Sequence, residues 1–397
     1  MTSDASLRVV FVTTHPIQYQ VPWMRRLAET PGFDVHVLYG MLPDARQQGV
    51  GFGVDFTWDV PLLEGYAWSA LENVAARPSL ATRDGIDTPG VRARLAELDP
   101  DVVVICGWQA RCLLQATRAA VKLGIPRVVR GESNDLRPRA WWKRLVHRWH
   151  LRRFDAALAI GTANALFLRA AGMDASAIAL APYAVDTRHL EDAAKDRQAV
   201  GMAARARWNV SSDAVVAQFV GKLEPKKRPL DLVEAVARAR GHVPALELLV
   251  VGAGPLEAEV RARAQALGVP ATFTGFLNQG ELGPAYAAGD VFILPSDHGE
   301  TWGLVVNEAQ HVGLPVIVSD QVGCGPDLVT AGETGWTYPC GDVEALAARL
   351  VELGGDADAR ARLGAAGQRR IAGYTIERAV EATAEALRAV AAARRSR

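Results

Sequence analysis

The 397-residue chain is long enough for about two domains of ordinary size, each with its own hydrophobic core. Hydrophobic residues make up 49% of it and charged residues 22%, a balance that excludes a disordered or fibrous protein. Lys and Arg together number 44, as do Asp and Glu, which argues against a general binder of nucleic acid or other polyanions.

The first half of the chain alternates between predicted strands and helices. It opens with a β-α-β unit, made of a strand at residues 7–14, a helix at 20–29 and a strand at 34–39. Further strands are predicted at 102–106, 127–130 and 156–160. Residues 49–65 are rich in glycine and aromatic side chains, and their pattern alone does not indicate how they fold.

The same alternation begins again at residues 214–221, after an Ala/Arg-rich connection that we expect to be less ordered. The elements that follow are predicted as helix 230–240, strand 246–251, helix 255–267, strand 271–274, helix 281–288, strand 291–294, helix 304–311 and strand 315–319. Two such units predict an α/β protein with two Rossmann-like domains facing a cleft. We expect domains at 1–190 and 191–375, with a C-terminal helix and tail at 376–397 that packs back on the first domain.

Two glutamates bracket the junction between a loop and the helix predicted at 304–311. Seven residues separate Glu300 from Glu308, and the first-turn amides of the helix lie between them. Such amides lack internal partners and favour an anion. An anion site between two carboxylates suits a ligand whose phosphates lie between two groups of hydroxyls. A nucleotide-sugar is such a ligand. The alternative is an ordinary loop and buried helix with incidental acids.

Basic and glycine-rich turns follow two other strands of the second unit. Lys222 and Lys227 lie in GKLEPKKRP, where they would clamp a diphosphate; a solvated basic turn is the alternative. Gly252 and Gly254 lie in VGAGP and permit close backbone approach to a ligand. Glu257 takes the place of the third glycine of GxGxxG, which disfavours a dinucleotide-dependent oxidoreductase.

The order of motifs in the second unit resembles the retaining family 4 glycosyltransferases of the two-domain GT-B fold. The motifs are GKLEPKK, VGAGP, TGFLNQGEL, YAAGDVFILPS, GETWGLVVNEAQHVGLPVIVSD and AGETGW. The resemblance covers residues 214–375. It is looser in the first unit, where FDAALAIGTAN and APYAVD carry it.

The resemblance implies a role for each matched residue of the second unit. Glu300 would contact hydroxyls of the donor sugar, and Glu308 would hold the ribose hydroxyls. Lys227 would bind the diphosphate. The remaining donor-binding positions are the backbone of Gly303, Leu304 and Val305 at the helix start, Lys222 in place of the family's usual arginine, and Phe276 beside the nucleobase.

In the first unit the match is incomplete. Many family members carry a histidine after a central strand, and the register of PRVVRGES places Glu132 there. Glu132 would bind a sugar hydroxyl, or else form a structural pair with Arg130. His15, at the end of the first strand, is the second candidate for the reacting centre, and a simple helix-entry role is its alternative. The acceptor is expected around His15, Trp108 and Glu132.

The resemblance implies transfer with retention of the anomeric configuration, without an enzyme nucleophile and without a metal. The two DxD matches, at 99–101 and 356–358, are typical of a strand entry and a helix start. We expect no cofactor, and a UDP-sugar is favoured as the donor substrate. A sugar-nucleotide epimerase of the same fold and a non-catalytic nucleotide-sugar binding protein are the alternatives.

Residues 141–154, WWKRLVHRWHLRRF, combine aromatic and basic side chains on a predicted helix. The pattern is compatible with a membrane surface and a lipid-linked acceptor, besides a glycan or small-molecule acceptor. A domain helix with a packed aromatic side and a solvated basic side is the favoured alternative. Four scattered cysteines, no signal peptide and no long apolar run lead us to expect a cytoplasmic protein, with peripheral contact at the inner face of the membrane as an option.

Overall fold

The computed structural model describes residues 6–137 and 139–395 of the chain. Contacts between residues divide the chain into two compact units. Of the described residues, the first unit contains 6–48, 60–137, 139–184 and 375–395, and the second contains 49–59 and 185–374. The chain therefore enters the second unit briefly at 49–59, returns to the first, and comes back to it again at its C-terminus.

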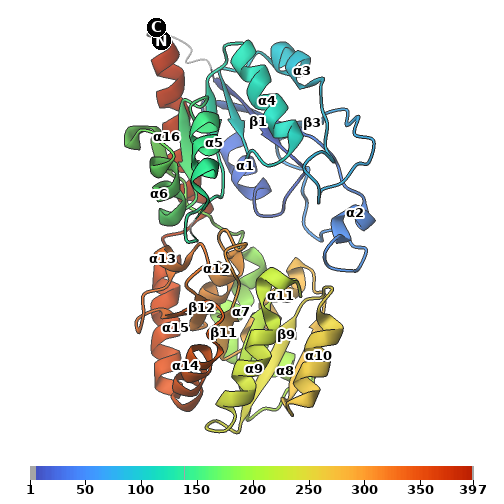
Figure 1. Cartoon of the computed structure of the whole chain (residues 1–397), viewed down its shortest axis with the longest axis vertical. Coiled ribbons are helices and arrows are strands. Elements are labelled where there is room, and N and C mark those ends of the chain that lie inside the picture. Colours follow the sequence, from blue (N-terminus) through green and yellow to red (C-terminus); the bar gives the residue numbers. More distant parts are fainter. Residues whose placement is uncertain (1–5, 138, 396–397) are drawn as a thin grey trace. The chain divides into compact units, whose positions relative to one another are not determined.

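The first unit is built on a parallel sheet in the order β3-β2-β1-β4-β5-β6-β7 (Figure 1). Its strands are β1 (Leu7–Thr13), β2 (Phe33–Tyr39), β3 (Ala67–Ala70), β4 (Val102–Ile105), β5 (Arg127–Val129), β6 (Ala156–Ala159) and β7 (Ile178–Leu180). The central strands are runs of valine and isoleucine because both faces of the sheet are covered.

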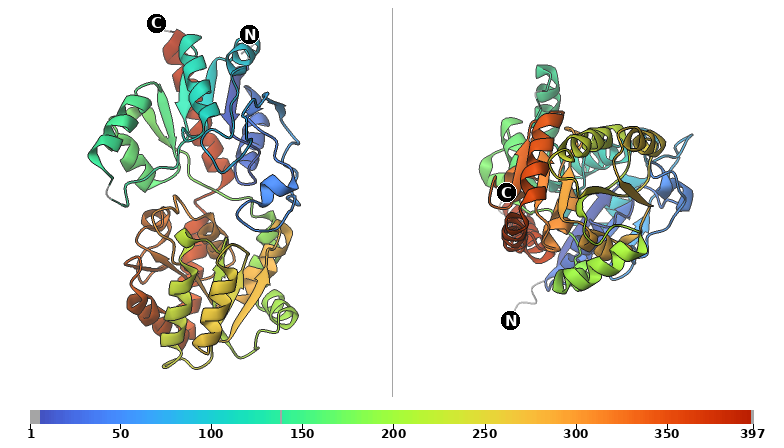
Figure 2. Two further views of the ribbon diagram at one scale, coloured as in Figure 1. Left: turned by 45° about the vertical axis from the view of Figure 1, so that its right-hand side comes forward. Right: turned by 90° about the horizontal axis from the view of Figure 1, so that it is seen from below.

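Helices cover both faces of this sheet. They are α1 (Val21–Ala28), α2 (Ala45–Gly49), α3 (Val91–Leu98), α4 (Arg111–Lys122), α5 (Trp141–Leu151), α6 (Thr162–Ala170), the 3₁₀ turn η1 (Ala175–Ala177) and α16 (Ile376–Arg395). The last helix, α16, packs against α1 and the strands β4, β6 and β7, as Figure 2 shows for the red helix. The Trp23 indole of α1 donates to Thr383 of α16 over 3.0 Å, so a buried hydrogen bond joins the two ends of the chain.

The second unit repeats the architecture with a parallel sheet in the order β10-β9-β8-β11-β12-β13. Its strands are β8 (Val215–Val220), β9 (Leu246–Val251), β10 (Ala271–Gly275), β11 (Val291–Leu294), β12 (Val316–Ser319) and β13 (Gly335–Tyr338). The expectation of two Rossmann-like α/β units is confirmed by these two doubly wound sheets.

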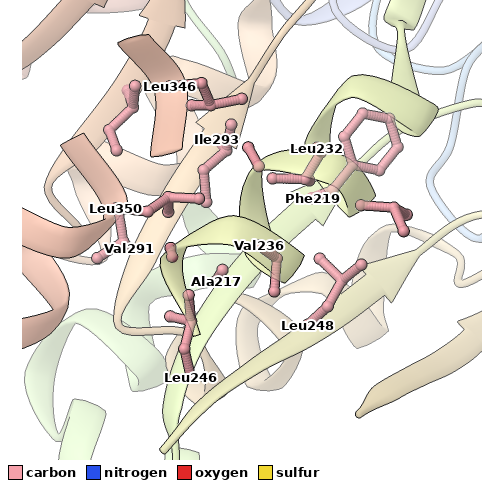
Figure 3. Packing of buried hydrophobic residues seen from close by; sticks show 14 of the residues in the cluster. Ala217, Phe219, Leu232, Val236, Leu246, Leu248, Val291, Ile293, Leu346 and Leu350 are labelled. Carbon is pink, nitrogen blue, oxygen red and sulfur yellow. The ribbon is translucent and has the colours of Figure 1, made fainter. Parts of the chain in front are cut away.

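The helices of the second unit pack on this sheet and form one continuous core. They are η2 (Arg188–Leu190), α7 (Glu191–Lys195), α8 (Arg197–Arg207), η3 (Pro225–Lys227), α9 (Pro229–Ala239), α10 (Glu257–Ala266), α11 (Gln279–Ala288), α12 (Leu304–His311), α13 (Gly325–Leu328), α14 (Val343–Gly355) and α15 (Ala357–Ile371). Figure 3 shows how Leu232 and Val236 of α9 meet Phe219 of β8 and Leu248 of β9. Burial of these apolar side chains stabilises the second unit by roughly 25 cal/mol for each Å² of apolar surface removed from water.

One expectation about secondary structure needs correction. The connection expected to be less ordered contains α7 and α8, because Asp196 caps α8 by accepting from the amide of Ala199 over 3.0 Å. The segment 49–65, whose fold its pattern alone did not indicate, contains the end of α2 and a stretch, residues 49–59, that belongs to the second unit.

Among the described residues, no helix combines the length and the apolar character that crossing a lipid bilayer requires.

Candidate active site

The candidate site lies at the carboxyl edge of the second sheet. The strand order reverses between β8 and β11, and open α/β sheets bind ligands outside the carboxyl ends of the strands at such a point. Lys222 follows β8 after Gly221, and Glu300 lies in the loop that follows β11. The ends of these two strands thus bring together motifs that are far apart in the sequence.

An ion pair between Lys227 and Glu300 lies at the centre of this edge. Both side chains are largely buried, and Lys227 is only 9% exposed. Lys227 ends the turn η3, and the next residue, Arg228, adopts a left-handed conformation with φ of 49°. Such a conformation costs roughly 1–2 kcal/mol for a residue with a side chain, and it turns the chain sharply after Lys227.

The loop that carries Glu300 is held by hydrogen bonds on both sides. The Glu300 amide donates to the carbonyl of Asp297 over 2.9 Å, and the Gly323 amide donates to the carbonyl of Glu300 over 3.1 Å. The Ser296 hydroxyl lies 3.4 Å from the Glu300 carboxylate. The carboxylate therefore keeps a defined position beside Lys227.

Glu308 is buried in the second turn of α12, with 6% of its surface exposed. The Tyr286 hydroxyl of α11 donates a 2.6 Å hydrogen bond to its carboxyl group. Burial raises the pKa of Glu308 to about 7, and the hydrogen bond from Tyr286 offsets part of that rise. The carboxyl group thus gains or loses its proton near neutral pH. Tyr286 was not among the predicted site residues, although it stands in the quoted motif YAAGDVFILPS.

The start of α12 requires glycine at position 303. Gly303 has φ of 102°, and a Cβ there would lie 2.9 Å from the Leu294 side chain. The amides of Leu304 and Val305 follow it in the first turn, as expected of an anion site at a helix start. The backbone therefore has the geometry that the predicted role needs.

Gly252 and Gly254 have a structural explanation of their own. A Cβ at Gly254 would lie 2.6 Å from backbone atoms of Leu223, and Gly252 packs on the backbone of Gly221 with φ of 128°. Close approach between two turns thus requires both glycines. Their predicted contact with the donor stays a prediction.

Lys222 and Phe276 both contact residues 50–59, a segment that we call the strap. The Lys222 ammonium donates to the carbonyl of Val50 over 3.3 Å, and burial lowers its pKa. Phe276 packs its ring against Phe52 and Phe56. No pattern in the sequence predicts this contact, since no periodicity marks the strap.

The first unit has a cavity of about 360 Å³ at the carboxyl ends of β1, β4 and β5. Its strand order also reverses here, between β1 and β4. Trp108 and Glu132 line the cavity, as do Thr14 and Ile17 on either side of His15. The structure thus brings the predicted first-unit residues to one strand edge.

Glu132 accepts a hydrogen bond from the hydroxyl of Tyr183. Tyr183 is buried, and its ring lies 5.0 Å from the guanidinium of Arg130, which contacts Trp23 on another side at 4.3 Å. Arg130 also donates to the carbonyl of Ala181 over 3.1 Å. Tyr183 therefore orients Glu132, a role that the sequence did not predict because 51 residues separate the two.

His15 has a local partner. Its Nδ1 lies 2.9 Å from the hydroxyl of Thr14, and the ring is half-buried. This contact fixes the ring next to the cavity without deciding between a ligand-binding and a helix-entry role.

The aromatic side of helix α5 was expected to pack against the domain, and this expectation is wrong. Trp141 is 74% exposed and Trp149 is 63% exposed, while His150 is buried against Trp108. Burial lowers the pKa of His150 to about 4, so this anchor is neutral at pH 7. The helix therefore packs on the first unit through His150, and the side chains of Trp141 and Trp149 face solvent.

The aspartates of the DxD matches have structural roles, and the cysteines form no disulfide among the described residues. Asp99 and Asp101 both pair with Arg8, and Asp356 caps α15 through the amide of Ala359. All four cysteines are free thiols. Among the described residues, no three His, Cys, Asp or Glu side chains gather as metal ligands would.

Comparison with known proteins identifies relatives of this arrangement. Residues 203–370 match the family described as glycosyl transferases group 1. The chain is 33% identical over 270 residues to a GDP-mannose-dependent alpha-mannosyltransferase of Mycobacterium tuberculosis, covering 66% of each chain. It is 36% identical over 158 residues to the sulfoquinovosyl transferase SQD2 of Arabidopsis thaliana, covering 39% of this chain and 29% of that relative. The chain thus spans less than two thirds of the length of these curated relatives.

A solved structure has a fold similar to that of this chain. HepE of Anabaena, in complex with UDP and glucose, superposes with a TM-score of 0.70 at 17% identity, over 96% of this chain and all of HepE. The expected GT-B fold class is thereby confirmed. The matched segment, residues 203–370, contains Lys222, Lys227 and the whole Glu300–Glu308 stretch, so the second unit contains a group 1 glycosyl transferase domain, as its motifs indicated.

Proposed function

We propose that the protein moves a sugar from a nucleotide-diphosphate sugar to an acceptor hydroxyl, with retention at the anomeric carbon and without a resident metal. The observation that carries this proposal is the buried Lys227–Glu300 pair next to the start of α12. A cation, a set of helix amides and a carboxylate at one sheet edge suit a diphosphate joined to a sugar.

The proposed reaction needs no covalent intermediate with the enzyme. The acceptor oxygen forms a bond to the anomeric carbon as the bond from that carbon to the diphosphate oxygen breaks. The acceptor proton passes to a diphosphate oxygen on the same face of the sugar. Lys222, Lys227 and the first amides of α12 stabilise the charge that develops on the leaving diphosphate.

The two glutamates position the donor in this scheme. The diphosphate draws the ammonium of Lys227 away from the Glu300 carboxylate. Glu300 then accepts hydrogen bonds from hydroxyls of the transferred sugar. Glu308 accepts hydrogen bonds from the ribose hydroxyls. Its ionised form is the stronger hydrogen-bond acceptor. Gly252, Gly254 and the backbone of Phe276 complete the donor side.

We propose a UDP-sugar as the donor, and the support for it is the HepE structure, which holds UDP and glucose. The mannosyltransferase relative, named for GDP-mannose, makes a GDP-sugar the alternative. Thermal unfolding with UDP, GDP, UDP-glucose and GDP-mannose tests this choice, because a bound ligand raises the melting temperature.

Mass spectrometry of candidate acceptors with the best donor then tests transfer itself. A product heavier than its acceptor by one glycosyl residue supports the proposal. Conversion of the donor to an isomer without an acceptor indicates an epimerase, and binding without any turnover indicates a silent binding protein.

The acceptor is proposed to enter the first-unit cavity, where Glu132 would bind its hydroxyl and His15 lies at the rim. A volume of about 360 Å³ is at the small end of the range for ligand pockets. It therefore suits a monosaccharide or a polyol headgroup, and a longer glycan or a lipid would extend out of it.

Peripheral contact of α5 with the inner face of an anionic membrane is part of this proposal. Exposed apolar side chains alternate with basic ones along the helix, and the guanidinium of Arg153 lies 3.5 Å over the ring of Trp149. Tryptophan and arginine together favour the interface between lipid and water, which is where a lipid-linked acceptor presents its hydroxyl.

A further inference from the structure

We propose that the strap, residues 50–59, lines the donor site, and that Phe52 and Phe56 form with Phe276 the aromatic wall on which the nucleobase of the donor stacks. The strap is supplied by the connection between α2 and β3 of the first sheet, yet it packs within the second unit. The inference rests on the proposed function, since it requires a nucleoside diphosphate at this edge.

The C-terminal end of the strap is tied to the start of α11. The Asn278 side-chain amide donates to the carbonyl of Thr57 over 2.8 Å. The Gly280 backbone amide donates to the carboxylate of Asp59 over 2.9 Å. Asp59 thus satisfies a first-turn amide, as a carboxylate at a helix N-terminus does favourably. These contacts fix the strap beside the end of β10.

The N-terminal end of the strap is tied to Lys222. The Lys222 ammonium donates to the carbonyl of Val50 over 3.3 Å and lies 4.2 Å from the ring centre of Phe52. Gly51 and Gly53 have φ of 91° and 74°, a region that favours glycine, and they flank Phe52. The turn between them therefore presents the Phe52 ring to the lysine that follows β8.

The rings of the strap form one cluster with Phe276. Phe56 lies 4.2 Å from Phe276 with 36° between the ring planes, and Phe52 lies 5.0 Å from Phe276. The Phe56 ring also contacts those of Phe52 and Trp58, at 5.2 and 4.9 Å. The four rings are only half-buried, so ring surface remains for a further flat heteroaromatic group.

The strand order gives this cluster a place in the donor site. Phe276 follows β10 and Lys222 follows β8, with β9 between them. Two strand spacings amount to roughly 10 Å, a distance that a nucleoside diphosphate covers from its base to its phosphates. Glu300, after β11, lies beyond the lysines. The edge therefore offers aromatic rings, cations and a carboxylate in the order of base, diphosphate and sugar.

Equilibrium binding to the full-length chain tests the proposal. The probes are UDP, GDP, ADP and CDP, of which the tightest binder to the wild type is used, and inorganic pyrophosphate. Phe56→Ala is expected to weaken nucleotide binding by about tenfold, the usual effect of losing one aromatic stacking partner. Pyrophosphate, which has no base, should bind both proteins within a factor of about two. Val54→Ala is the matched control, because Val54 lies in the strap but is 40% exposed.

Equal nucleotide binding by wild type and Phe56→Ala overturns the proposal. So does tighter binding by the variant, since the strap would then obstruct the site. A loss of pyrophosphate binding as large as the loss of nucleotide binding also overturns it, because the base would not be the group involved. If no nucleotide binds the wild type, the proposed function itself fails. Thermal unfolding of each variant checks that it is folded.

Discussion

At the carboxyl edge of the second sheet, charged side chains of opposite sign contact each other, whereas the matching edge of the first sheet is hollowed into a cavity of about 360 Å³. The side chains of Lys227 and Glu300 are both largely buried and hold each other in position. In the first unit, Glu132 is held by a neutral hydroxyl at the cavity wall. The edge of the second sheet therefore suits a ligand of fixed charge pattern, and the edge of the first sheet suits a ligand selected by its shape.

The largest effect is expected from removing the charge pair of the second unit. Lys227→Met should lower kcat by about 10²–10³, because the leaving diphosphate loses a stabilising cation. The variant also leaves Glu300 buried without its partner, which is expected to destabilise the fold by about 3–5 kcal/mol. Steady-state kinetics and denaturant unfolding measure the two effects.

The double variant Lys227→Met/Glu300→Gln separates these effects. It removes both charges, so most of the stability should return while turnover stays low. Recovery of turnover together with stability would sink the assignment of Lys227 and Glu300 to the reaction.

The next effect is expected from Glu308. Glu308→Gln should weaken nucleotide binding by about tenfold at pH 8, since an amide accepts ribose hydroxyls less well than a carboxylate. Because the pKa of Glu308 is about 7, wild-type binding should strengthen as pH rises from 6 to 8, and binding by the variant should not. Calorimetric titration at several pH values measures this, and equal pH profiles would contradict it.

The same pKa predicts a change in stability with pH. Folding raises the pKa of Glu308 from 4.5 to about 7, so the folded state holds this proton over a range in which the unfolded chain has lost it. The free energy of unfolding should therefore fall as pH rises from about 4.5 to 7, by an amount on the order of 3 kcal/mol. Glu308→Gln should lack this component.

A smaller effect, confined to the acceptor, is expected in the first unit. Tyr183→Phe removes the hydroxyl that orients Glu132 and should raise the KM for the acceptor about fivefold to tenfold, which is the size of one hydrogen bond. Binding of the donor nucleotide should not change. A change in nucleotide affinity as large as the change in acceptor KM would remove the contrast between the two edges.

The smallest effect on the fold is expected at α5. Trp141→Ala/Trp149→Ala replaces two exposed rings, so the free energy of unfolding should change by less than about 0.5 kcal/mol per site. Sedimentation with vesicles of anionic lipid should fall severalfold, and neutral vesicles should bind neither protein well. Leu166→Ala, at an exposed apolar position on α6, is a matched control. Unchanged sedimentation of the double variant would exclude α5 as the membrane contact.

Elements with strong local patterns were predictable from the sequence. Strands β9 and β11 and helix α12 have the predicted bounds, because continuous apolar runs and the Gly303 start mark them. The edge strands β3, β7 and β13 were not predicted. They have three or four residues each and are only partly buried, so little in their sequence distinguishes them from loops.

Site residues that belong to a sequence motif were predictable. Contacts between residues that are distant in the sequence were not. Glu300, Glu308 and Lys227 follow from the motifs, and their predicted roles remain to be tested. The contacts Tyr286–Glu308, Tyr183–Glu132 and Lys222–Val50 join residues that are 22, 51 and 172 positions apart. No periodicity or spacing rule connects residues across such distances, since tertiary packing alone brings them together.

Hydrogen exchange of the full-length chain, with and without the nucleotide that gives the largest thermal shift, tests most directly that the donor binds at the edge of the second sheet. We predict that the nucleotide slows exchange at residues 221–227 and at 300–308, and less strongly in the strap. Slowed exchange confined to residues 13–20 and 106–133 of the first unit, with no change at 300–308, would contradict the account.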